Sequence, residues 1–232
     1  IEAVRLLQEN GHMVILSTGR VPSLFYGVDK KLNIDTYIGA NGRLVVHKGR
    51  VVLAQYIDKE TVQKVVDLSE EIGVDIGFES ETDYVINSDN SGFSSKFSDI
   101  FHLEYPKVVK NYHLNHDILQ LVLFYDKPDY KKFENLFPTL SFNYSNPFGI
   151  DVNPRGGLKD VGVKALIEDL GLDLKDTIAV GDGFNDISMI QLVEIGIAMG
   201  NACQDLKDVA KYVTDDVDNN GIYNIFKKLE LI

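Results

Sequence analysis

The sequence predicts an α/β fold in which a doubly wound parallel sheet is interrupted by an inserted α+β domain. Three observations predict it: an early apolar run that ends in turn residues, a middle region that mixes helix and strand patterns with polar turns, and alternating strand and helix patterns towards the C-terminus. We expect residues 1–55 and 150–232 to form one discontinuous core domain, and residues 56–149 to form a cap domain.

The first part of the chain predicts a helix that ends near Gly11, followed by a buried strand over residues 13–16. We expect a second helix over about residues 22–31. Asn41-Gly42 stands between two apolar stretches, a pattern that is typical of a β-hairpin turn.

The middle region mixes helix and strand patterns with turns rich in Ser, Asp, Asn and Tyr. We expect a helix over residues 59–72, a strand over 118–125 and a helix over about 129–137, which together predict the α+β cap. His113 and His116 have no third metal ligand nearby in the sequence, so we expect both to be surface histidines.

The last part of the chain returns to strand and helix in alternation. A strand over residues 150–152 precedes a helix over 159–170 that Gly171 ends. A strand over 177–180 and a final helix over 222–229 follow, and this alternation predicts parallel strands.

The composition excludes several classes of partner. The 232 residues carry 23 Lys and Arg against 35 Asp and Glu, a formal net charge of −12, which argues against nucleic-acid and anionic-membrane binding. The single Cys203 cannot form an internal disulfide, and no apolar run is long enough to span a membrane. We therefore expect a cytoplasmic protein, monomeric or weakly dimeric, with a small-molecule partner.

The N-terminus begins on an apolar residue. Ile1, Val4 and Leu7 already lie at helical spacing, and no capping residue precedes them. We expect the given chain to start inside a helix, with further residues upstream.

Polar residues follow predicted strands at three places, where ligands bind in open α/β sheets. Ser17-Thr18-Gly19-Arg20 follows the first strand and could cradle an anion, although an ordinary turn has about even odds. Lys159 begins a predicted helix, where its charge opposes the macrodipole by about 0.3–1 kcal/mol. That cost raises the case for a role in reaching an anion, but for this lysine alone the alternative of a solvated surface side chain stays favoured.

The third cluster, Gly181-Asp182-Gly183-Phe184-Asn185-Asp186, is the most specific signal in the chain. Two carboxylates directly after a buried strand suit Mg²⁺, which proteins hold through one or two carboxylates with water and phosphate. The alternative is a turn rich in Asp and Gly that caps the next helix.

With these motifs the sequence resembles the haloacid dehalogenase superfamily of phosphohydrolases, and more narrowly its Cof-type branch with a C2-type cap. The resemblance rests on Thr18-Gly19-Arg20, Asn41-Gly42, the stretch from Asn153 to Lys159, and the third cluster. It implies a Mg²⁺-dependent phosphatase that works through an aspartyl-phosphate intermediate. The family's Asp-x-Asp-Gly-Thr motif, which supplies nucleophile and general acid/base, is absent from these residues, and we expect it upstream of Ile1.

The resemblance also implies roles for single residues. Asp182 would bind Mg²⁺ with Asp186 in support, Thr18 and the Gly19 amide would hold phosphoryl oxygens, Lys159 would neutralise charge, and Asn185 would orient phosphate.

The cap is expected to select the substrate, a small phosphorylated metabolite. Sugar phosphates are the leading class, and nucleotide monophosphates and phosphorylated cofactors stay open. Four residues could line it: Glu79, Glu81, Asp83 and Tyr84. Two alternatives stay open, a non-catalytic protein that binds phosphate or metabolites on the same fold, and a sugar phosphomutase.

Overall fold

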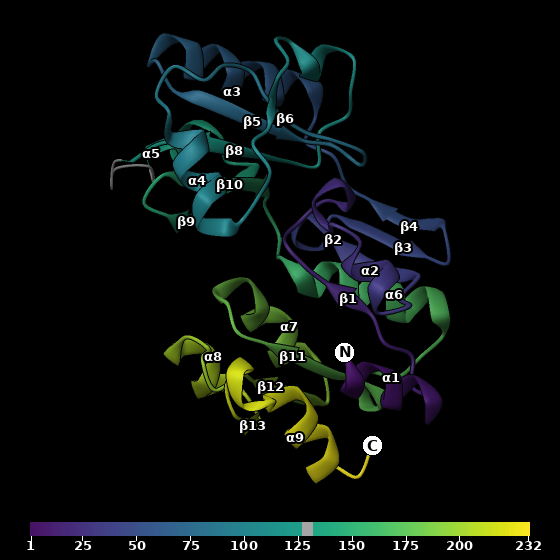
Figure 1. Cartoon of the computed structure of the whole chain (residues 1–232). Helices are drawn as coiled ribbons and strands as arrows, with labels where there is room; N and C mark the ends of the chain where they lie inside the picture. The colour runs from purple at the N-terminus through teal and green to yellow at the C-terminus, as the bar shows by residue number, and fades with distance from the viewer. Residues whose placement is uncertain (127–131) are drawn as a thin grey trace. The chain divides into compact units, whose positions relative to one another are not determined.

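The computed structural model describes residues 1–126 and 132–232 (Figure 1). The chain divides into two compact units. Unit 1 comprises Ile1–Gly19, Gly27–Leu53 and Gly157–Ile232, and unit 2 comprises Arg20–Tyr26 and Ala54–Gly156. The first residues of the helix expected over 129–137 lie outside the described residues, and α5 is described over Lys132–Leu136.

Unit 1 contains two sheets among its described residues. The first runs in the order β1 (Leu16–Ser17), β2 (Thr36–Gly39), β3 (Leu44–His47), β4 (Arg50–Ala54). β1 and β2 are parallel, whereas β2 and β3 are antiparallel, so the hairpin predicted at Asn41-Gly42 is confirmed. α6 (Lys159–Leu170) packs on this sheet through a small cluster formed by Ile38, Val45 and Leu166.

The second sheet of unit 1 is entirely parallel, in the order β11 (Ile178–Gly181), β12 (Ile195–Ala198), β13 (Tyr212–Val213). Its crossovers are α7 (Ile187–Leu192) and α8 (Gln204–Val209), which bury Met189, Ile190 and Leu206. α1 (Glu2–Glu9) and α9 (Gly221–Lys228) share a second cluster. Parallel strands that are connected by helices confirm the predicted α/β class.

Unit 2 is an α+β body with one six-stranded sheet, in the order β7-β6-β5-β8-β10-β9. The strands are β5 (Asp75–Glu79), β6 (Tyr84–Ile86), β7 (Lys107–Val108), β8 (Gln120–Phe124), β9 (Leu140–Asn146) and β10 (Gly149–Pro154). α3 (Lys59–Glu71) buries Val62, Val65 and Val66 in the core on one face, and its N-cap Asp58 accepts a hydrogen bond from the Thr61 amide at 2.9 Å.

Four local expectations differ from the structure. The strand expected over residues 13–16 is confined to β1 at Leu16–Ser17. The helix expected over residues 22–31 is a 3-10 turn at Pro22–Leu24 and a short α2 at Val28–Lys31, because Tyr26 and Gly27 adopt positive φ between them. The strand over 150–152, expected in the core, is part of β10 in the sheet of unit 2. His113 is buried and stacks on Phe78, so the surface expectation is wrong for it.

No helix in the described ranges is both long and apolar enough to cross a membrane.

Candidate active site in unit 1

The site lies where polar loops follow β1 and β11, at the start of α6. Thr18 and Gly19 follow β1, and Asp182 to Asp186 follow β11 in a loop that includes a 3-10 turn at Phe184–Asp186. Lys159 is the first residue of α6.

A buried ion pair joins two of these segments. Lys159 Nζ lies 2.5 Å from Asp186 Oδ1, and the two side chains are 7% and 5% exposed. The surface alternative for Lys159 is therefore wrong. Because an ammonium has three N–H donors, its pairing with Asp186 leaves donor capacity for a further anion.

Asp186 also organises the loop that precedes it. Its second oxygen, Oδ2, accepts hydrogen bonds from the Asp182 amide at 2.9 Å and the Gly183 amide at 3.0 Å. Gly181 leaves space for this carboxylate, since a Cβ there would lie 2.6 Å from Asp186 Cγ. Both oxygens of Asp186 are thus engaged within the protein.

Asp182 has the opposite character. Asp182 is exposed, and its Oδ2 accepts a hydrogen bond from Asn201 Nδ2 at 3.3 Å. A hard, largely open carboxylate suits Mg²⁺, so Asp182 fits as one ligand. Within residues 1–126 and 132–232, no group of three or more His, Cys, Asp or Glu is arranged to hold a metal. The fit therefore rests on Asp182 together with non-protein ligands.

Asn41 brings the β1 loop and the β11 loop together. Asn185 Nδ2 donates to Asn41 Oδ1 at 2.9 Å, and the Asn41 amide donates to the Thr18 carbonyl at 3.2 Å. Gly19 lies close to the same side chain, because a Cβ on Gly19 would be 2.9 Å from Asn41 Oδ1. Asn41 was expected only as a turn residue, so its bridging role was missed.

Arg43 is a second residue that the sequence did not reveal. It is buried, and its Nη2 donates to the Gly157 carbonyl at 2.5 Å, just before α6. Burial lowers the pKa of Arg43, and the nearby charge of Asp160 opposes that shift. Burial raises the pKa of Asp160, but hydrogen bonds from Lys164 and the Leu158 amide outweigh it, so the net shift is downward.

Arg20 is assigned to unit 2, whereas Thr18 and Gly19 are assigned to unit 1. Its guanidinium belongs to unit 2, where Nη2 donates to the Phe101 carbonyl at 2.9 Å. Of the expected cap residues, Glu81 accepts from Tyr56 and Asp83 accepts from Tyr112, whereas Glu79 and Tyr84 lie side by side on adjacent strands.

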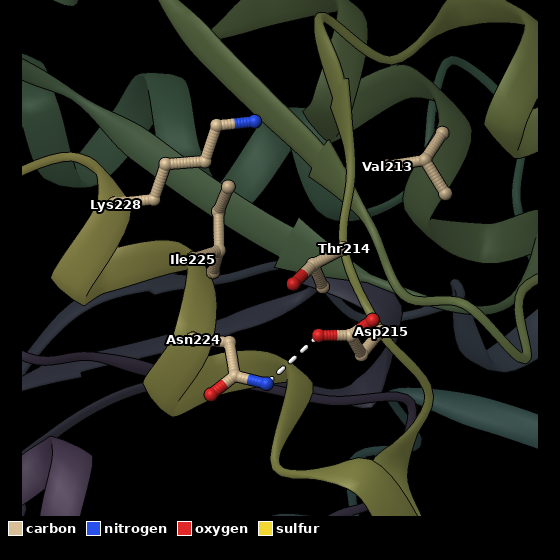
Figure 2. A pocket seen from close by; sticks show the side chains of 6 residues that line it. All are labelled: Val213, Thr214, Asp215, Asn224, Ile225 and Lys228. Atoms are coloured by element: carbon tan, nitrogen blue, oxygen red, sulfur yellow. Dashed lines mark hydrogen bonds between the residues drawn. The ribbon is translucent and has the colours of Figure 1, made fainter.

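A separate surface pocket of about 230 Å³ lies beside β13 and α9 (Figure 2). In it, Asn224 Nδ2 donates to Asp215 Oδ2 at 2.8 Å. None of the residues of the candidate site lines this pocket; its lining is Val213, Thr214, Asp215, Asn224, Ile225 and Lys228.

The comparisons with known proteins identify the class. Residues 1–226 match the haloacid dehalogenase-like hydrolase family, so the chain belongs to this family. It is 31% identical over 231 residues to the protein YkrA of Bacillus subtilis (strain 168), covering all of this chain and 90% of that protein.

Solved structures agree with this membership. A hypothetical protein of Geobacillus kaustophilus HTA426 superposes with a TM-score of 0.92 at 35% identity, covering 100% of this chain and 90% of the other. The subclass IIB sugar phosphatase BT4131 of the same superfamily superposes with a TM-score of 0.87 at 29% identity, with the same coverages.

Proposed function

We propose that this chain carries most of a Mg²⁺-dependent phosphatase that hydrolyses small phosphate monoesters. The observation that carries the proposal is the buried Lys159–Asp186 pair beside the exposed Asp182 carboxylate. Phosphoryl transfer depends mainly on positioning and on charge stabilisation, and this arrangement offers a fixed cation next to an open metal ligand.

Each residue of the site has a role in this proposal. Lys159 places positive charge at the phosphoryl oxygens, and Asp186 holds both Lys159 and the Asp182 loop in place. Thr18 and the Gly19 amide bind phosphoryl oxygens, and Asn185 orients the phosphate from its position on Asn41. Mg²⁺ bound at Asp182 would supply further neutralisation of the phosphate.

In this proposal the nucleophile comes from outside these residues. The sequence contains no Asp-x-Asp-Gly-Thr, and the match to YkrA leaves a tenth of that protein uncovered. We place this motif in the segment upstream of Ile1. There one carboxylate attacks phosphorus while the ester oxygen departs and takes a proton from the second, and water then hydrolyses the acyl phosphate.

Sugar phosphates are the substrate class that we propose. BT4131, at 29% identity over the whole of this chain, is described as a sugar phosphatase.

The complete protein, including its upstream segment, should release phosphate from sugar phosphates only with Mg²⁺ present. Asp182→Asn should strongly reduce this release, while Asp205→Asn, on the exposed first turn of α8, should not change it. Release without any metal dependence would contradict the Mg²⁺ assignment. Binding without release would show a non-catalytic protein, and transfer of phosphate to another position of the same sugar would show a mutase.

A further inference from the structure

A row of four polar side chains crosses one face of the sheet in unit 2. In register, Tyr84 of β6 lies beside Glu79 of β5, and Glu79 lies beside Gln120 of β8. Asn153 of β10 follows the pair Val152–Leu121, which places it beside Gln120. Because residues paired across strands point to the same face, these four side chains form one continuous row.

This row is buried although it is polar. Tyr84 is 8% exposed, Glu79 is 5%, Gln120 is 3% and Asn153 is 0%. Next to the row on the same face lie Val122 of β8 and its partner Asp151 of β10, and four residues from Gln120 the ring of Phe124 packs on Phe97 of α4 (Phe93–Phe101). The row is therefore not ordinary solvated surface.

Several polar atoms of the row have no partner in the described part of the chain. The Asn153 side chain makes no hydrogen bond through either Oδ1 or Nδ2, and the Tyr84 hydroxyl makes none. Leaving a buried polar group unpaired costs about 1–3 kcal/mol. Three such atoms on one face indicate hydrogen-bonding capacity that is kept for a ligand.

Burial also favours the neutral form of the one carboxyl group in this row. Burial raises the pKa of Glu79 to about 8, the charge of Asp151 acts in the same direction, and the hydrogen bond from Gln120 and the charge of Arg20 oppose it. Gln120 Nε2 donates to Glu79 Oε2 at 2.6 Å, so the protonated Glu79 remains a donor through its O–H.

We propose that this row binds neighbouring hydroxyl groups of a sugar or polyol. Amide, phenol and carboxylic acid groups offer donors and acceptors without net charge, which matches hydroxyls, since each hydroxyl both donates and accepts. The inference rests on the proposed function in one respect: the organic part of a phosphate monoester is one source of these hydroxyls, and a free polyol is the other.

The test uses Asn153→Leu and Tyr84→Phe in the complete protein. Asn153→Leu keeps the number of side-chain heavy atoms and Tyr84→Phe removes one. Both remove unpartnered polar atoms, so neither should lower the free energy of unfolding. Tyr125→Phe is the matched control, because the Tyr125 hydroxyl already accepts from Lys132 Nζ at 3.0 Å on the opposite face. Affinities are measured by titration calorimetry for free sugars and polyols, for their phosphate esters, for phenyl phosphate and for inorganic phosphate.

The affinity ratio of a polyol phosphate to phenyl phosphate should fall about tenfold in Asn153→Leu, as expected for one lost hydrogen bond to a buried group, and should stay unchanged in Tyr125→Phe. If free polyols bind and Asn153→Leu weakens their binding as much as that of polyol phosphates, the ligand of the row is an unphosphorylated polyol. An unchanged ratio in both row variants overturns the inference, even if phosphate release is normal. Polyol binding that depends on Asn153, without hydrolysis of any ester, would instead support the row and contradict the proposed function.

Discussion

At the scale of single residues, the pair between Lys159 and Asp186 determines how the site is held. Two charged groups this deeply buried have lost most of their hydration, so each depends on the other for compensation. Asp186 has additional support from two backbone amides, whereas the ammonium of Lys159 is held by Asp186. Removing the lysine therefore leaves a buried carboxylate without a counter-charge.

Lys159→Met should lower the free energy of unfolding by about 3–5 kcal/mol, the usual cost of an uncompensated buried charge. Lys164→Met on the same helix removes an exposed cation from its pair with Asp160 and should cost less than about 1 kcal/mol. Urea unfolding of both variants at pH 7 measures the difference. Equal losses would show that Lys159 is not electrostatically coupled to Asp186.

At the scale of elements, the β2–β3 connection and α6 meet backbone to backbone. Ala40, Asn41 and Gly42 all adopt positive φ, at 47°, 52° and 92°. This tight turn directs the Asn41 side chain towards Asn185 and brings Gly42 close to Leu158, the residue before α6. Gly162 in α6 completes the contact, since a Cβ there would lie 2.4 Å from Ile38 Cγ2.

Gly42→Ala should destabilise the protein more than Gly11→Ala. Both positions have positive φ, which costs a residue with a Cβ about 1–2 kcal/mol. At Gly42 the new Cβ would also lie 2.3 Å from the Leu158 carbonyl oxygen, whereas at Gly11 nothing lies within 4 Å. Thermal unfolding should give an additional loss of about 1–3 kcal/mol for Gly42→Ala. Similar losses in the two variants would mean that α6 moves away freely.

Local patterns predicted the hairpin and the helix over Lys159–Leu170 because turn formation and helix termination depend on residues that are adjacent in the sequence. The same patterns placed Lys159, Asp182, Asn185 and Asp186 at strand and helix ends, where the structure has them. The Lys159–Asp186 pair spans 27 positions, and the Asn41–Asn185 contact spans 144, so no local pattern reports either. The buried row of unit 2 depends on strand register, which single-strand alternation does not determine.

At the scale of the whole molecule, acidity and burial act together. The chain carries a net charge of −12, and one of its carboxyl groups, Glu79, lies inside unit 2 near Asp151. Ionising Glu79 there carries a desolvation cost that is absent for an exposed carboxyl group. The pH dependence of stability therefore contains a contribution from this single group.

The pKa of Glu79 is raised from 4.5 to about 8, so its contribution to stability is complete below about pH 4.5 and is lost as the pH rises to about 8. Relative to Glu79→Gln, the wild-type free energy of unfolding should fall by about 1.4 kcal/mol per pH unit across this window. Urea titrations at several pH values measure the slope. Glu71→Gln, an exposed control in α3, should run parallel to wild type, and a parallel Glu79→Gln profile would contradict the assignment.

Both sheets of unit 1 end on an outer strand with one unpaired side: within the described residues β1 has β2 as its neighbour, and β11 has β12. Open strand edges present rows of free N–H and C=O groups that pair readily with other strands. The purified 232-residue chain should therefore aggregate more as its concentration rises. A peptide in extended conformation that pairs with either edge should keep it in solution.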